Sequence, residues 1–101
     1  MKQRTIQISY DLSRPADEYP ELLAYLRRHR ATKPLARTWF IKTTSTAMQV
    51  RDEIVAFTAD EDEILVMDVT GVEWATTFED LTTDWMDSEM PLGRSATRRG
   101  R

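Results

Sequence analysis

Asp11 is the residue whose type and position are best suited to chemistry in this chain. It lies near the end of the segment 5–12, in which apolar and polar side chains alternate as in a half-buried strand. The alternation places Asp11 on the same face as Ser9, away from the helices. A carboxylate there can bind Mg²⁺ or Mn²⁺, and two copies across a dimer axis can activate a water for phosphodiester attack. The alternative role of Asp11 is to cap the turn at Ser13 or Arg14.

The other residue types that perform chemistry give weaker signals. Asp68 is expected on the side of its strand that corresponds to Ser9, either as a second carboxylate or paired with a buried arginine. His29, the single histidine, stands among arginines and is expected at the surface. The chain has no cysteine, which excludes disulfides, thiolate zinc sites and cysteine nucleophiles. Its three glycines are not spaced as a phosphate-binding loop.

The charged residues are sorted along the chain, although the net charge is only −3. Thirteen acidic residues and no basic one occupy positions 52–89, whereas positions 27–42 hold basic residues and no acidic one. This sorting predicts a local basic surface that can bind a polyanion or the acidic face of a partner. Alternatively, the acidic stretch pairs with the basic one inside the fold or across a dimer. The basic residues of the block are Arg27, Arg28, Arg30, Lys33, Arg37 and Lys42.

Length and composition predict one ordinary globular domain. A chain of 101 residues has room for one core, which we expect to occupy residues 1–90, followed by a disordered basic tail over residues 91–101. No apolar run approaches the ~20 residues that cross a bilayer, so no membrane association is expected. The first eleven residues contain no apolar stretch of signal-peptide length, and a cytoplasmic location is expected.

The hydrophobic pattern predicts a fold of alternating strands and helices. Thr46 and Gln49 match a capping box and mark the start of the second helix. The order of elements predicts an α+β, ferredoxin-like βαββαβ sandwich, with an antiparallel sheet, two helices on one face and an extra C-terminal strand. The predicted strands cover residues 5–12, 31–35 (as a bent piece), 35–43, 64–70 and 73–78, and the helices cover 18–30, 46–58 and 80–89.

The second face of this sheet is expected to be apolar in part. In the strand 64–70, Leu65 and Met67 point to one side while Ile64 and Val66 point to the other. An exposed apolar face is unusual in a soluble monomer, so we expect a homodimer that packs these faces together. Alternatively, the C-terminal segment folds over the face with Leu81, Trp85 and Met86.

Three short motifs carry a resemblance to a known family. They are Ser9-Tyr10-Asp11-Leu12 with the following Arg14-Pro15, the segment 38–43, and the helix start over 46–54. Over residues 5–78 the chain resembles small SinR-like proteins, which are related to the VapD toxins and to the second CRISPR adaptation protein (Cas-two). The resemblance implies a ferredoxin-like fold and a homodimer formed through sheet faces. It also implies that Asp11 is the metal-linked residue of a nuclease site, with Tyr10 as the aromatic residue before it.

Three functional hypotheses follow from these patterns. The leading one is a metal-dependent endonuclease that uses Asp11 from both subunits, with phosphate contacts from Arg14, Arg27, Arg37 and Lys42 on RNA or DNA. The second is a non-catalytic dimeric scaffold that bridges nucleic acid and a partner nuclease or integrase. The third is a protein-binding regulator whose acidic half covers a basic partner.

Overall fold

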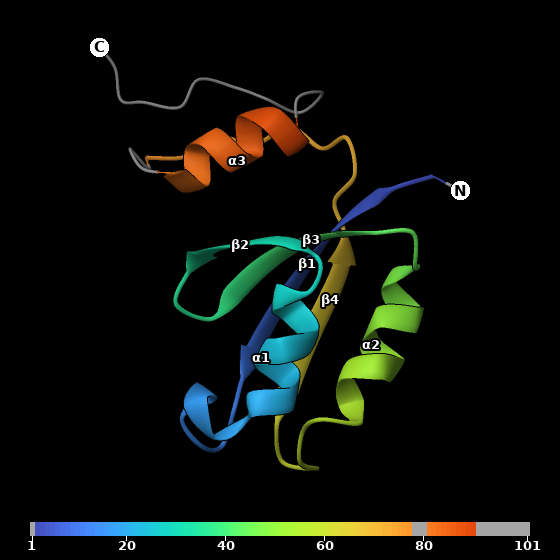
Figure 1. The fold of residues 1–101 in the computed structure, drawn as a ribbon, viewed down its shortest axis with the longest axis vertical. Helices are drawn as coiled ribbons and strands as arrows, with labels where there is room; N and C mark the ends of the chain where they lie inside the picture. Colours follow the sequence, from blue (N-terminus) through green and yellow to red (C-terminus); the bar gives the residue numbers. More distant parts are fainter. Residues whose placement is uncertain (1, 78–80, 91–101) are drawn as a thin grey trace.

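A computed structural model describes residues 2–77 and 81–90, without the side chains of residues 81–83. It contains one four-stranded antiparallel sheet with the strand order β2-β3-β1-β4, together with helices α1, α2 and α3 (Figure 1). The predicted α+β class is therefore confirmed, while the predicted tail over residues 91–101 lies outside the described part. The strands are β1 (Arg4–Asp11), β2 (Arg30–Leu35), β3 (Thr38–Thr43) and β4 (Glu63–Asp68), and the helices are η1 (Ala16–Glu18), α1 (Pro20–Arg27), α2 (Ala47–Val55) and α3 (Leu81–Glu89).

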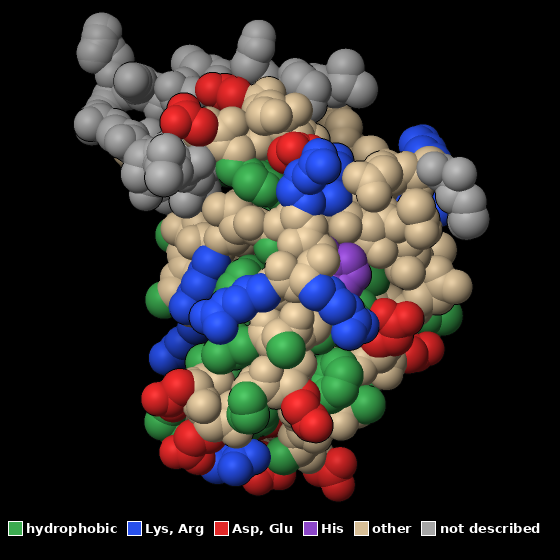
Figure 2. All heavy atoms as spheres, viewed as in Figure 1, with side chains coloured by type: hydrophobic (Ala, Val, Ile, Leu, Met, Phe, Trp, Pro, Cys, Tyr) green, Lys and Arg blue, Asp and Glu red, His purple; other side chains and the backbone are tan. Residues whose placement is uncertain are grey.

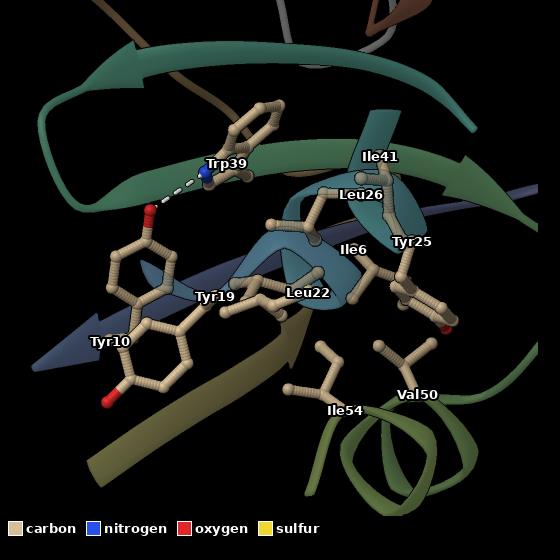
Figure 3. Close-up of a cluster of buried hydrophobic side chains, with 11 residues drawn as sticks. Ile6, Tyr10, Tyr19, Leu22, Tyr25, Leu26, Trp39, Ile41, Val50 and Ile54 are labelled. Carbon is tan, nitrogen blue, oxygen red and sulfur yellow. Dashed lines mark hydrogen bonds between the residues drawn. The ribbon is translucent and has the colours of Figure 1, made fainter. Parts of the chain in front are cut away.

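Strand β1 is central and pairs with β3 on one side and with β4 on the other. Its alternating sequence explains this position, because Ile6, Ile8 and Tyr10 are buried on the face that carries α1 and α2. The two helices lie side by side on this face, as predicted (Figure 1). The main core lies between them and the sheet (Figure 3). It consists of Ile6, Ile8, Tyr10, Tyr19, Leu22, Tyr25, Leu26, Trp39, Ile41, Val50 and Ile54.

Local sequence signals fix where the helices begin. The capping box at α2 is confirmed: the Gln49 backbone N–H donates to Thr46 Oγ1 at 3.1 Å, and the Thr46 N–H donates to Gln49 Oε1 at 2.8 Å. Pro20 opens α1, where its missing N–H costs nothing. The helix predicted over residues 18–30 is shorter in the structure, because β2 already begins at Arg30 and pairs with β3.

The second face of the sheet is partly covered by α3. Phe40 points away from the main core and stacks on Trp85 of α3, with 6.3 Å between the ring centroids. A second cluster continues from this contact and contains Val69, Trp74, Met86 and Met90. The alternative in which the C-terminal segment folds over this face is thus confirmed for the half of the sheet formed by β2 and β3.

The predicted C-terminal strand over residues 73–78 is wrong, because residues 73–77 form no strand. The segment has strand-like residues, but a contact with the C-terminal helix decides its conformation. Trp74 is buried, and its Nε1 donates to the Met90 carbonyl at 2.9 Å. Within the described part, no helix combines the length and apolar character required to cross a membrane.

Candidate functional site

Asp11 lies at the end of β1, on the second face of the sheet, as predicted. Its side chain is 71% exposed, and its Oδ1 is 3.9 Å from Nη1 of Arg37 in the turn between β2 and β3. The antiparallel register places Glu63 of β4 directly opposite Asp11. Both residues line a shallow hollow with Ser9 and Leu65. Two carboxylates thus meet at this corner of the sheet, where like charges in direct opposition are unfavourable without a cation.

Asp68 does not join this pair, and its predicted placement on the same face as Ser9 is wrong. Asp68 lies opposite Ile6, on the other face and towards the other end of β1. Its Oδ2 accepts a hydrogen bond from Arg4 Nη1 at 2.9 Å, which confirms pairing with an arginine, although the Arg4 side chain is 36% exposed and not buried as predicted. Hydrogen bonds from the Thr70 hydroxyl and backbone N–H, together with Arg4, lower the pKa of Asp68. Asp68 therefore stabilises the turn that follows β4.

Arg14 and Arg37 come together on two sides of a second hollow, with a volume of about 250 Å³, next to Asp11. Arg14 belongs to the loop between β1 and η1, where its guanidinium lies 4.9 Å from the centroid of the Tyr19 ring. The backbone N–H of Tyr10 donates to the Arg37 carbonyl at 3.1 Å and ties the turn of Arg37 to β1. The structure therefore groups two of the predicted phosphate ligands with Asp11.

A carboxylate holds the loop of Arg14 in place. Asp62 accepts hydrogen bonds from the Ser13 backbone N–H at 2.7 Å, the Ala59 backbone N–H at 2.8 Å and the Tyr19 hydroxyl at 3.1 Å. These donors, the Ala59 N–H foremost, lower the pKa of Asp62 to about 2. Asp62 thus stays ionised and joins the β1–η1 loop to the loop before β4.

The basic block forms an exposed band at the end of α1 and on β2, which we call the basic band: Arg27, Arg28 and Lys33. Figure 2 shows Lys and Arg side chains crossing this face beside the single histidine. Arg28 lies 4.9 Å from the Tyr25 ring centroid and Lys33 lies 6.0 Å from that of Trp39. In the described residues no carboxylate comes within 4.0 Å of the three cations. The acidic residues that the structure describes therefore leave this part of the basic block unpaired.

Lys42 belongs to a different part of the surface. It is half-buried beneath α3, where its Nζ donates to Thr5 Oγ1 at 2.8 Å and to the Glu89 carbonyl at 3.0 Å. Arg30 lies at the same place and pairs with the Glu89 carboxylate at 3.2 Å. Lys42 and Arg30 thus anchor α3, and they are separated from the basic band by the sheet.

His29, expected at the surface, is half-buried. Its Nδ1 is 2.9 Å from the Tyr25 carbonyl, and its ring packs against the Tyr25 ring with 4.9 Å between centroids. The Tyr25 hydroxyl donates to Glu53 Oε1 at 2.6 Å, and burial followed by this bond raises the pKa of Tyr25. These contacts join α1 to α2 and support the end of α1 from which the basic band projects.

Comparisons with protein-family models, curated proteins and solved structures gave no match. The resemblance to the SinR-like and VapD proteins therefore stays a prediction. In the parts of the chain that the structure describes, no three His, Asp or Glu side chains gather into a metal-binding group.

Sequence reasoning missed Glu63 as a neighbour of Asp11. The predicted strand began at residue 64, but Glu63 is the first residue of β4. The pairing depends on the register between β1 and β4, and no local signal reports that register. Arg28 and Lys33 were visible as members of the basic block, but only the structure separates them from the cations that have acidic partners.

Proposed function

We propose that this chain binds the phosphate backbone of nucleic acid as a homodimer. The observation that carries the proposal is the basic band, in which Arg27, Arg28 and Lys33 are exposed without an acidic partner in the described part of the chain. Such cations bind phosphates and release the counterions condensed around a polyanion, which drives association. A band without side chains arranged to read bases predicts binding that is independent of sequence.

A ferredoxin-like fold of the SinR-like and VapD kind is part of this proposal. The alternation of strands and helices supports it, as do two helices on one face of an antiparallel sheet. Helix α3 on the second face, in place of an extra strand, sets this chain apart from the predicted arrangement.

The proposed dimer uses the half of the second face that α3 leaves open. On β4, Leu65 is 55% exposed and Met67 is 44% exposed, and they lie opposite Ser9 and Gln7 of β1. Apolar side chains on an otherwise polar sheet face support burial against a second copy. The basic bands lie on the other face of each protomer, so the dimer would leave both accessible to nucleic acid.

Metal-dependent phosphodiester hydrolysis is a second candidate function, favoured by the juxtaposition of Asp11 and Glu63. Exposed carboxylates fit Mg²⁺ or Mn²⁺, because these ions prefer oxygen ligands and retain several waters. Asp11 and Glu63 would hold the ion, which supplies an activated water when bound. Arg37, 3.9 Å from Asp11, would orient a neighbouring phosphate.

The binding proposal is tested by fluorescence anisotropy with single-stranded and duplex oligonucleotides at low salt. The triple variant Arg27→Gln/Arg28→Gln/Lys33→Gln is expected to bind at least about tenfold more weakly than wild type. The control Arg51→Gln removes an arginine of α2 that pairs with Asp52 at 2.7 Å, and its affinity is expected to be unchanged. Equal affinity of wild type and the triple variant would overturn the proposal.

Hydrolysis is tested by comparing wild type with Asp11→Asn on labelled RNA and duplex DNA in Mg²⁺, Mn²⁺ or EDTA. The endonuclease hypothesis predicts cleavage that requires the metal and disappears in the variant. Binding without cleavage in either protein supports a scaffold that presents nucleic acid to a partner nuclease or integrase. Equal cleavage by both proteins would contradict a role for Asp11.

A further inference from the structure

The hollow beside Asp11, which we call the arginine hollow, has an arginine on each of two sides. Its volume is about 250 Å³, and it lies between the β1–η1 loop and the turn between β2 and β3. Arg14 comes from the loop and Arg37 from the turn, while Tyr10 of β1 lines the hollow between them. Hydrogen bonds to Asp62 join the loop of Arg14 to the loop before β4, and the backbone bond from Tyr10 to Arg37 joins the turn of Arg37 to β1.

The two guanidinium groups have unused donors. Nη1 of Arg14 is 3.8 Å from Glu18 Oε1, and Nη1 of Arg37 is 3.9 Å from Asp11 Oδ1, both beyond hydrogen-bond distance. Neither guanidinium makes a hydrogen bond to another described residue. Exposed ion pairs of this length contribute little, so an anion that accepts hydrogen bonds from both arginines can replace them.

Tyr10 also lines the hollow. Its side chain is only 7% exposed, and its hydroxyl oxygen accepts a hydrogen bond from Trp39 Nε1 at 3.1 Å (Figure 3). The hydroxyl proton itself has no acceptor among the residues described here. Leaving a buried donor unpaired is unfavourable, so this proton is available to an oxygen that reaches it.

We propose that the arginine hollow binds the terminal phosphate of a nucleic-acid strand, an inference that rests on the proposed function. A phosphomonoester is favoured over a backbone diester for two reasons. It carries up to two negative charges, since its second pKa is about 6, and it presents three oxygens to the two guanidinium forks.

The test compares oligonucleotides of one sequence that carry a 5′-phosphate, a 3′-phosphate or only hydroxyl ends. At pH 7.5, wild type is expected to bind either the 5′-phosphorylated or the 3′-phosphorylated oligonucleotide about tenfold more tightly than the oligonucleotide with hydroxyl ends. This preference is expected to shrink at pH 5, where the monoester loses its second charge. Arg14→Gln and Arg37→Gln are expected to abolish the preference for the phosphorylated end, and the matched control Arg51→Gln is expected to keep it.

The outcomes separate this inference from the proposed function. Equal binding of phosphorylated and hydroxyl ends by wild type overturns the inference but leaves backbone binding intact. A preference that survives in both Arg14→Gln and Arg37→Gln also overturns it. If no oligonucleotide binds, the proposed function fails, and titration with a nucleoside 5′-monophosphate against the nucleoside then decides the inference. Binding of the nucleoside monophosphate but not of the nucleoside supports the phosphate site in the arginine hollow. If neither compound binds, the inference is overturned.

Discussion

Replacing Tyr10 with phenylalanine removes one hydrogen-bond acceptor from the core without changing its shape. In wild type the Tyr10 hydroxyl accepts from Trp39 Nε1 at 3.1 Å, and the two side chains are only 7% and 5% exposed. The variant leaves the indole N–H buried without a partner. Such a group costs about 1–3 kcal/mol, so Tyr10→Phe is expected to lower the free energy of unfolding by about 2 kcal/mol. This is a substantial part of the ~5–15 kcal/mol typical of a single domain.

Urea unfolding followed by far-UV circular dichroism measures this loss. With a typical slope of about 2 kcal/mol per molar urea, the midpoint is expected to fall by about 1 M with no change in slope. The same substitution in a Trp39→Phe background is expected to cost much less, because no indole N–H remains to be orphaned. An equal cost in both backgrounds, or a midpoint unchanged by Tyr10→Phe, would refute the buried bond between β1 and β3.

Three further predictions concern the elements that position the site. The pKa of Asp62 falls to about 2 on folding from an ordinary 3.8, so its contribution to stability is present above pH 4 and is lost as the pH falls towards 2. In thermal melts, the melting temperature of Asp62→Asn is therefore expected to fall less steeply with acid than that of wild type. Parallel falls would contradict the role of Asp62 in joining the two loops. Thr46→Ala is expected to cost about 1 kcal/mol in urea unfolding, because it removes the acceptor of the Gln49 N–H, and no change would argue against the capping box. Leu65→Asp is expected to convert the dimer to a monomer, as measured by light scattering after gel filtration. Val55→Asp is the control, because Val55 of α2 is about equally exposed at 54%, and this variant is expected to remain a dimer. The opposite pattern would place the interface elsewhere.

The sequence predicted the elements whose signals are local. The alternation from Thr5 to Leu12 located each end of β1, observed as Arg4–Asp11, to within one residue, and the capping box located the start of α2. The end of α1 was misplaced because arginine suits both the last turn of a helix and an exposed edge strand, so nothing marks Arg30 as the start of β2.

The remaining features depend on contacts distant in sequence. Trp74 lies in a strand-like segment but packs with Met86 and Met90, which no local pattern reports. The sequence did carry one hint of α3, since Phe40 points to the face opposite Trp39 and therefore needed a partner there. The candidate site also depends on distant contacts. The alternation of its strand predicted the position of Asp11, but strand register places Glu63 beside it and a turn places Arg37 there.

The salt dependence of nucleic-acid binding tests the central claim most directly. The logarithm of the association constant falls linearly with the logarithm of salt concentration, with a slope of about −0.7 to −0.9 for each phosphate contact. Wild type is expected to show a steep slope, and the slope of Arg27→Gln/Arg28→Gln/Lys33→Gln is expected to be smaller by about 2 per protomer. The same slope in wild type and variant, or no binding by wild type at low salt, would contradict the claim that the basic band binds phosphates.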